Sequence, residues 1–573
     1  MRIHPERVGD GLFYAIVFVV FVMPLLRLAA MAFTPSEGQV SILANFAAVA
    51  ADERTAPAVA NTLLVAVGSC AIATLLGTVL AFIVAYLDVP AKRAIELLTL
   101  MPFIVPSYIV SMGWGALLGP TGELNRVLSG AGLPQLNVYS LGGIVFVLGI
   151  CSVPVVYLNV ISTLRKVPRD QEWAARAAGC SIARTMVVVN LAECAPAIVA
   201  GAVLSFLSAI DNFAVPAFLG ISSNVPVLST LIYQEAIGFG PGSFNIAAAL
   251  SVVLALLALV TIAVQRLILR RAAQLEGGTE DREPRIACSF WTRPVIAAVV
   301  LAILVALNVV PVLTMVLSAF RKVDGVAIGP DNLTTDNFAF VLSNSGVRQA
   351  AANSLFLAVA ACVICIAVGM FTAYGAQRRG ARGMRLVEAA ASLTYSLPGI
   401  VLALAMIFRW SGVPGVYGTM NILLISYVMR YLLLEVKGSA TALNAVDASV
   451  EEAARVAGAG PVRRWMRIMA PLLAGPVLSN AFLIFVLSST ELTLSSLLAG
   501  AGTRTIGLAI FSFQQAGDYD LAAAFSTCIV VVVLAGYALL QVAGHIRKGA
   551  VGPARLGVNG TDGKTGDGNA SNR

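Results

Sequence analysis

The stretch EEAARVAGAGPVRRWMRIMAPLLAGP, residues 451–476, is a charged, alanine-rich island between two long apolar runs. A similar island, EWAARAAGCSIARTMVVVNLAECAPAI, covers residues 172–198. Alanine and glutamate favour a helix and glycine interrupts one, so each island predicts a helix, a break and a second helix. A charged segment of this kind cannot lie in lipid, and we expect both islands to project into water. Aligning Gly458 with Gly179 superposes Glu451 on Glu172, Ala453 on Ala174, Ala454 on Ala175 and Arg455 on Arg176.

The composition indicates a membrane protein. Of the 573 residues, 58% are hydrophobic and 12% are charged, and the mean hydropathy is +0.86. Soluble domains have about a quarter of charged residues, whereas a membrane-spanning helix needs about 20 apolar residues in succession. We therefore expect an all-α protein that crosses the bilayer many times.

The apolar runs divide into two sets of six about a hydrophilic linker. The linker sequence LEGGTEDREPR, residues 275–285, is rich in glycine and charge and marks a boundary. We predict a first half at 1–271, a linker at 272–293, a second half at 294–548 and a disordered tail at 549–573. The predicted spans are 11–33, 57–87, 96–118, 141–163, 196–217 and 245–265, then 294–319, 351–376, 386–408, 417–436, 472–495 and 521–543.

The charge distribution predicts the orientation. Under these spans, about 30 of the 38 Lys and Arg residues fall on the side that holds both islands, the linker and both termini. By the positive-inside rule this side is the cytoplasm. The net charge of +8 then reflects membrane topology and not nucleic-acid binding. The first apolar run lacks a small-residue cleavage pattern, which favours a true span over a signal peptide.

The two halves repeat each other beyond the islands. Asn61 and Thr62 match Asn353 and Ser354 at the same spacing that relates Gly77 to Gly369, Ala81 to Ala373 and Pro106 to Pro398. With six spans each, the halves have the same orientation, so they form parallel repeats about an axis along the membrane normal. Proline at 102, 106 and 398 predicts bends in the third span of each half.

Two acids fall inside predicted spans. An ionisable group in the membrane is costly to bury and is a functional candidate by default. Asp211 and Glu491, which we align with each other, lie in the outward part of the fifth spans and are predicted to line the translocation path or its outer gate. The alternative is that each acid ends a span and faces outer water. Arg27, Arg409 and Arg430 are interpreted as residues at helix ends or with snorkelling side chains.

Several functional classes lack their sequence signature. The only partial nucleotide-binding motif, Gly563 to Thr565, lacks the glycine five positions earlier that a phosphate-binding loop needs. The two histidines lie near the termini, and Cys362 and Cys365 are interpreted as small packing residues within a span. We therefore expect no catalytic residues, no bound metal and no cofactor.

The second island resembles the EAA loop of the membrane subunits of ABC importers. That pattern is Glu-Ala-Ala, three residues, glycine and a later hydrophobic-x-proline. It is matched by Glu452, Ala453, Ala454, Gly458, Ile468 and Pro471. The first island departs twice, with Trp173 in the glutamate position and Ala192 in the proline position. We name residues 168–198 the first loop and residues 447–476 the second loop. Without the resemblance, either island could be an ordinary amphipathic cytosolic loop.

The resemblance implies a type I importer fold and a function. The fused form, with DNFAVPAFLG at 211–220 and ELTLSSLLAG at 491–500, is similar to the ferric-iron permeases of bacterial inner membranes. It implies that a periplasmic binding protein delivers the solute and that two separate ATPase subunits dock on the loops. The implied coupling residues are Glu172, Ala174, Ala175, Arg176, Gly179, Glu451, Glu452, Ala453, Ala454, Arg455, Gly458 and Pro471.

Other substrates and another class of transporter remain open. Related permeases carry thiamine, phosphonate or polyamines, and no spacing in this sequence specifies iron. Two carboxylates would suit a hard trivalent cation, yet many solutes would accept them. A secondary transporter driven by an ion gradient is the alternative of a different class, and it would be expected to show inverted repeats or buried acid and base relays.

Overall fold

The computed structural model describes residues 11, 13–35, 41–238, 240, 242–269, 280–323, 325–326 and 329–550. Residues 1–10, the end of the predicted first half at 271, the start of the linker and the tail from 551 lie outside the described residues. The chain divides into two compact units, Met1–Cys528 and Ile529–Arg573. All contacts reported below lie within the first unit.

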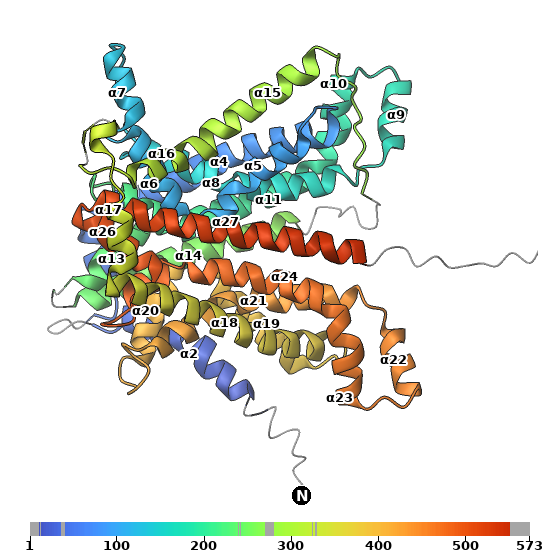
Figure 1. Cartoon of the computed structure of the whole chain (residues 1–573). Coiled ribbons are helices and arrows are strands. Elements are labelled where there is room, and N and C mark those ends of the chain that lie inside the picture. Colours follow the sequence, from blue (N-terminus) through green and yellow to red (C-terminus); the bar gives the residue numbers. More distant parts are fainter. Residues whose placement is uncertain are drawn as a thin grey trace, which may run out of the picture. The chain divides into compact units, whose positions relative to one another are not determined.

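The described residues are mostly helical (Figure 1). The elements before the linker are η1 (Phe18–Val22), α2 (Met23–Ala32), α3 (Ala44–Ala51), α4 (Thr55–Tyr86), α5 (Lys92–Ile104), α6 (Ser107–Leu118), α7 (Glu123–Gly130), α8 (Leu141–Leu164), α9 (Arg169–Ala177), α10 (Ile182–Thr185), η2 (Met186–Leu191), α11 (Ala192–Asp211), α12 (Ala214–Leu219), α13 (Leu228–Ile237) and α14 (Ser243–Leu269). The elements after it are α15 (Thr292–Leu304), η3 (Val305–Val309), α16 (Val310–Ser318), η4 (Pro330–Asn332), α17 (Asp336–Ser343), α18 (Ser345–Gln377), α19 (Arg382–Ser396), α20 (Gly399–Trp410), α21 (Met420–Asn444), α22 (Ala448–Val456), α23 (Pro461–Arg464), η5 (Trp465–Met469), α24 (Ala470–Ser489), α25 (Thr493–Leu498), α26 (Ile506–Ala516) and α27 (Tyr519–Ala550).

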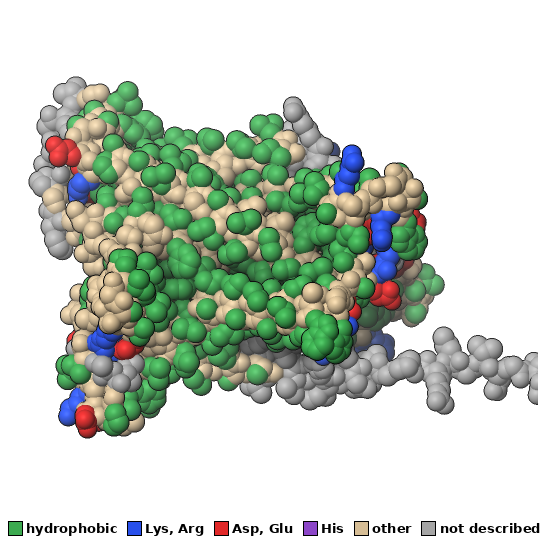
Figure 2. All heavy atoms as spheres, turned by 90° about the horizontal axis from the view of Figure 1, so that it is seen from above, with side chains coloured by type: hydrophobic (Ala, Val, Ile, Leu, Met, Phe, Trp, Pro, Cys, Tyr) green, Lys and Arg blue, Asp and Glu red, His purple; other side chains and the backbone are tan. Residues whose placement is uncertain are grey.

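The helices agree with the predicted membrane protein. Among the described residues, nine helices are long and apolar enough to cross a membrane, or eleven if each of two bent pairs counts as one span. Helix α21 occupies the place of the fourth span of the second half but carries Arg430, Glu435 and Lys437. Counting α21 brings the helices to the predicted twelve. Figure 2 shows hydrophobic side chains along the middle of one face, with charged side chains gathered towards its two ends.

The third spans are broken, not merely bent. The chain bends by 103° between α5 and the segment Ser107–Gly130, which begins with α6, and by 113° between α19 and α20. The breaks fall at Pro106 and Pro398, whose ψ angles of 140° and 138° are extended. A proline disfavours helical geometry in the residue before it, and Val105 and Leu397 are indeed extended. Pro102, by contrast, lies inside α5.

The fifth spans begin and end earlier than predicted. The continuous helical segments are Ile182–Asp211 and Pro461–Ser489, in place of 196–217 and 472–495. The prediction followed apolar content alone, whereas these helices continue out of the apolar layer into the two loops. At the other end, short separate helices, α12 and α25, replace the last predicted turns.

The repeat extends to local backbone features. Each half has a π-helical turn in its first span, η1 and η3, directly before a proline-containing helix, and another in its fifth span, η2 and η5. Proline clashes with the carbonyl four residues earlier, and a π turn accommodates this. The proline that follows η5 is Pro471, which is exposed at the start of α24. The first loop has Ala192 there and keeps the same turn.

Matching side-chain bonds also join equivalent elements. Thr62 Oγ1 accepts a hydrogen bond from the N–H of Leu228 at 2.9 Å, and Ser354 Oγ accepts one from Ile506 at the same distance. Each bond ties the second span of its half to the start of the short helix α13 or α26. Thr62 and Ser354, which the sequence alignment pairs, therefore form the same hydrogen bond in the two halves.

The first span of each half packs on the other half (Figure 1). Helix α2 contacts α20, and α16 contacts α6. The α6–α16 approach is close because Gly113 has no side chain: a Cβ there would lie 2.6 Å from the carbonyl oxygen of Pro311. This exchange interlocks the two halves.

Candidate functional site

The two loops have the predicted helix, break and second helix. Two residues after the last residue of α9 and of α22 stands a glycine with positive φ, +88° at Gly179 and +77° at Gly458. A residue with a Cβ is strained in that conformation, so glycine allows the tight turn into α10 and α23. Both loops lie on the same side of the helix bundle, opposite to α7 and α26 (Figure 1).

Each loop turns one face inward and one outward. The predicted coupling residues Glu451 and Ala454 are buried, and their counterparts Glu172 and Ala175 are partly buried. The other predicted residues are exposed: Glu452, Ala453, Arg455, Gly458 and Pro471 in the second loop and Ala174, Arg176 and Gly179 in the first. The sequence prediction treats all of them as contacts for a partner. The structure divides them into an anchoring set and an outward set.

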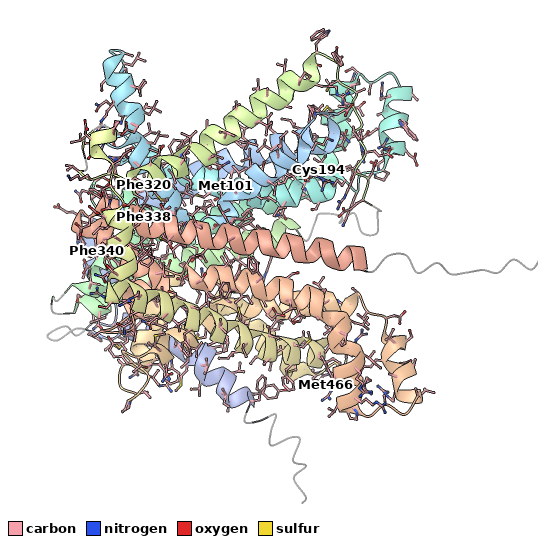
Figure 3. The ribbon with its side chains drawn as sticks, in the orientation of Figure 1. Met101, Cys194, Phe320, Phe338, Phe340 and Met466 are labelled. Carbon is pink, nitrogen blue, oxygen red and sulfur yellow. The ribbon has the colours of Figure 1, made fainter. Side chains whose placement is uncertain are left out.

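The second loop is anchored by side chains of its own half. Tyr374 donates a hydrogen bond to Glu451 at 2.5 Å, and the guanidinium of Arg464 lies 3.1 Å from the same carboxylate. Arg378, at the end of α18, donates to the backbone carbonyls of Leu443 and Val446. Met466, on η5, is 70% exposed (Figure 3).

The first loop is anchored differently. Asn190 donates to Glu172 at 2.5 Å and to the hydroxyl of Tyr86. Glu172 also forms an ion pair with Arg285, which belongs to the linker. Trp173, in the position of Glu452, is 60% exposed. Cys194, near the start of α11, is fully buried in the core behind the loop (Figure 3).

The described part of the linker is a bound segment, where the sequence predicted only a hydrophilic boundary. Its backbone pairs with the end of α4: Arg285 and Ile286 donate to the carbonyl of Tyr86, and Asp88 donates to Ile286. Arg169 of the first loop forms a two-pronged ion pair with Asp281. This guanidinium holds the pKa of Asp281 below its usual value.

Asp211 lies at an interface between the halves. Its carboxylate accepts a hydrogen bond from the N–H of Gly399 at 2.8 Å and forms an ion pair with Arg430. Both partners belong to the second half, on α20 and α21. The interpretation of Arg430 as a helix-end or snorkelling residue is wrong, because it lies in the middle of α21 with a side chain only 14% exposed. Its charge there is stabilised by Asp211 and by the carbonyl of Leu397 at 2.7 Å.

Glu491 is held within its own half. Its carboxylate accepts hydrogen bonds from the N–H of Leu494 at 2.7 Å and from the hydroxyl of Tyr431 at 2.8 Å. Tyr431 follows Arg430 in α21, so the structure connects the two predicted acids through adjacent residues. The connection is a network of partners and not an open pair of carboxylates.

The hydrogen bonds also correct the alignment of these acids. Asn212 Oδ1 accepts from the N–H of Val215 at 2.9 Å, three residues on, just as Glu491 accepts from Leu494. Glu491 is therefore equivalent to Asn212, and Asp211 is equivalent to Thr490. Pairing acid with acid shifted the sequence alignment by one residue.

Aromatic side chains close the space beside this network. Phe511, on α26 of the second half, lies 5.5 Å from Phe218 and 6.1 Å from Phe213, measured between ring centroids. Tyr233 and Tyr108 contact the same group. The three phenylalanines are at most 3% exposed. In this conformation the two halves are in contact on the side opposite to the loops.

The sequence missed one further buried acid. Glu435 of α21 is fully buried and accepts a hydrogen bond from Ser439 at 2.8 Å. It packs on Gly369, where the first half packs Val156 on Gly77. A charge in the middle of an apolar run was the available signal for both Glu435 and Arg430. Among the described residues, no three His, Cys, Asp or Glu side chains form a group that could hold a metal ion.

Comparison with known proteins identifies both halves. The profile of the family described as binding-protein-dependent transport system inner membrane component matches residues 73–274 and again residues 365–547. The probable ABC transporter permease protein y4fN of Sinorhizobium fredii is 23% identical over 88% of this chain and 91% of its own length.

Two further relatives carry substrates in their names. The ferric transport system permease protein FbpB of Actinobacillus pleuropneumoniae is 23% identical over 77% of this chain and 64% of its own length, so this chain spans less than two thirds of it. The spermidine/putrescine transport system permease protein PotC of Haemophilus influenzae is 26% identical over 40% of this chain and 90% of its own length.

Proposed function

Because this chain belongs to the family of binding-protein-dependent transport system inner membrane components, we propose that it forms the pathway of an ATP-driven importer. It is a multi-pass ABC transporter permease, and its two family segments supply both halves in one polypeptide. We propose ferric iron as the solute, delivered by a periplasmic binding protein. We place the two loops and both termini in the cytoplasm.

The repeated loop carries the proposal. Each loop exposes a short helix whose position is fixed by a glycine turn, and each presents charged residues outward, Arg176 in one and Glu452 and Arg455 in the other. Two matched, rigid projections on one side of a membrane protein fit two copies of a soluble partner. We assign that partner as a pair of ATPase subunits, since this chain has no nucleotide-binding motif of the phosphate-loop type.

Alternating access follows from the contacts on the opposite side. Asp211 bonds Gly399 and Arg430 across the halves, and Phe511 packs among aromatic residues of the first half. An outward-facing state requires these contacts to separate. ATP-driven movement of the loops would then be transmitted through the long fifth helices, which run from each loop to this contact region.

The choice of solute depends on the relatives. The name of FbpB supports ferric iron, while that of PotC supports a polyamine as the alternative. Thiamine and phosphonate remain alternatives within the same architecture. In each case the binding protein would select the solute, and the permease would provide the path.

Co-purification tests this function. The tagged chain is extracted from its native membrane in mild detergent, and the proteins and solutes that accompany it are identified. We expect a stoichiometric ATPase that is lost when Glu452 is changed to Lys, and a binding protein that contains iron. Uptake that persists in ATP-depleted vesicles without an associated ATPase would overturn the proposal in favour of an ion-gradient transporter.

A further inference from the structure

The linker residue Arg285 binds the backbone just before the first loop in the way that Arg378, at the end of α18, binds the backbone just before the second loop. Arg285 Nη2 donates to the carbonyl of Val167 at 2.7 Å. In the second half, Arg378 donates to the carbonyl of Val446, the residue equivalent to Val167. The position equivalent to Arg378 in the first half is Tyr86, which has no charge. A residue more than a hundred positions away along the chain thus fills the place of a missing arginine.

Arg285 also neutralises the anchoring glutamate. Its Nη1 atom donates to Glu172 and, at 3.2 Å, to the hydroxyl of Tyr86. The guanidinium carbon lies 4.8 Å from the centre of the Tyr86 ring, and the side chain is only 4% exposed. In the second loop, Glu451 is neutralised by Arg464, which belongs to the same loop. The equivalent position in the first loop is Thr185.

The linker is held in place by contacts on both sides of Arg285. Asp281 pairs with Arg169 and donates its N–H to the carbonyl of Arg165 at 2.7 Å. Ile286 packs against the hydrophobic core of the first half and pairs with Leu87. Hydrogen bonds at Asp281 and Ile286 fix the backbone on both sides of Arg285. Arg285 therefore loses little conformational entropy when its side chain binds Glu172 and Val167.

We propose that residues 281–286 form a strap that positions the first loop, with Arg285 as the positioning residue. The strap is then a working part of the transporter and not a passive connection between two permease halves. It makes the two loops dependent on different parts of the chain. The consequence for ATP coupling rests on the proposed function, whereas the position of the loop can be measured without it.

Hydrogen–deuterium exchange of the full chain in detergent tests the strap directly. In Arg285→Ala we expect the amides of 169–180 to exchange roughly tenfold faster or more, because charge-assisted bonds to Glu172 and Val167 are lost. The amides of 448–459 should not change. Arg282→Ala is the matched control, since Arg282 is exposed and pairs only with Glu280 among the described residues. Equal exchange in the two variants would overturn the proposal.

Two further variants separate positioning from general damage. Arg285→Lys keeps the charge but cannot make the divided contact to Glu172 and Val167, so intermediate exchange is expected. Tyr86→Arg, added to Arg285→Ala, copies the arrangement of Arg378 and should slow exchange in the first loop again. A double variant that exchanges as fast as Arg285→Ala would contradict the equivalence of Arg285 and Arg378.

The same variants are then assayed for ATP hydrolysis in the complex purified through a tag on this chain. We expect Arg285→Ala to lower kcat severalfold with little change in the KM for ATP. Faster exchange with normal hydrolysis and normal uptake would leave the strap in place and overturn the coupling role of the first loop. Unchanged exchange would overturn the strap whatever the hydrolysis rate.

Discussion

The two loops share a backbone and differ in what holds them. In both, a helix is followed by a glycine with positive φ, and a glutamate seven residues before that glycine faces inward. Around Glu451 the partners are Tyr374 and Arg464, both from the second half. Around Glu172 they are Asn190 and Arg285, and the second of these comes from the linker.

This difference shows how a fused repeat diverges. In a symmetric dimer every residue occurs twice and must suit both sides, whereas here each position occurs once. A related exchange lies in the membrane: Asn159 packs against Gly201 in the first half, and Asn480 packs against Gly438, the residue equivalent to Asn159, in the second. In both halves an asparagine packs against a glycine at this place, but the asparagine and the glycine have exchanged helices.

Proline at either loop glycine has the largest expected effect. Proline fixes φ near −65°, which is incompatible with +88° at Gly179 and +77° at Gly458. We expect normal membrane insertion and an ATP-driven transport rate lower by about two orders of magnitude in each variant, since strain of about 3 kcal/mol is enough for that change. Gly460→Ala is the control, because φ at Gly460 is −62° and a Cβ there meets no neighbour. Normal transport in Gly179→Pro alone would show that only the second loop couples.

Charge reversal of the glutamates separates anchoring from docking. Glu451→Lys and Glu172→Lys place two cations together in largely buried sites, so local opening of the loop should become easier by about 3 kcal/mol. Glu452→Lys, on the outward face, should leave amide exchange unchanged but release the ATPase. Exchange and co-purification are measured on the same preparations. Faster exchange in Glu452→Lys would contradict this division of the loop.

Neutralising Asp211 and Glu491 tests whether the two halves also differ within the membrane. Asp211→Asn combined with Glu491→Gln should lower transport by about tenfold, because about 1.4 kcal/mol of the stabilisation of this conformation is lost and the transport cycle returns to it less readily. Asp211→Thr copies Thr490, its structural equivalent, and is expected to resemble Asp211→Asn. ATPase association, read by co-purification, should be unchanged. Transport equal to that of the parent in the double variant would remove these acids from the pathway.

The smallest effect is expected at Trp173. Changing it to Glu restores the motif residue in the first loop, and Glu452→Trp makes the opposite change. Because Trp173 is 60% exposed and has no anchoring role, stability should change by no more than about 0.5 kcal/mol. ATP hydrolysis in Trp173→Glu is expected to stay within about threefold of the parent. A larger gain would indicate that tryptophan weakens docking on this side.

Much of this arrangement follows from local sequence. Apolar length gives the spans, and glycine within an alanine-rich helix gives the turn at Gly458, because both effects act over a few residues. The break at Pro106 was expected as a bend. Its size was not, since the angle depends on how α6 packs against α16.

Contacts between distant parts of the chain could not be predicted from the sequence. Arg430 belongs to the same polar network as Glu491 only because α21 and the end of α24 come together in the fold. The strap at Arg285 has no local signature, because Glu172 and Val167, which it holds, lie more than a hundred residues away. The alignment paired Asp211 with Glu491 because both are acids. The correct partner of Glu491 is Asn212, which is recognised by the hydrogen bond that its side chain accepts from the backbone of Val215, and the sequence does not show that bond.

The crossing of the first spans sets an order of events during synthesis. Helix α6 is made before α16, so α16 meets a finished partner as it enters the membrane. Helix α2 must remain in the bilayer without α20 while about 370 further residues are added, which takes roughly 20 to 70 s at common rates of translation. Until then the surface of α2 that packs on α20 faces lipid or the insertion machinery. A chain that stops before residue 399 therefore leaves its first span without that partner, which makes the synthesis of α20 the step that secures the first span.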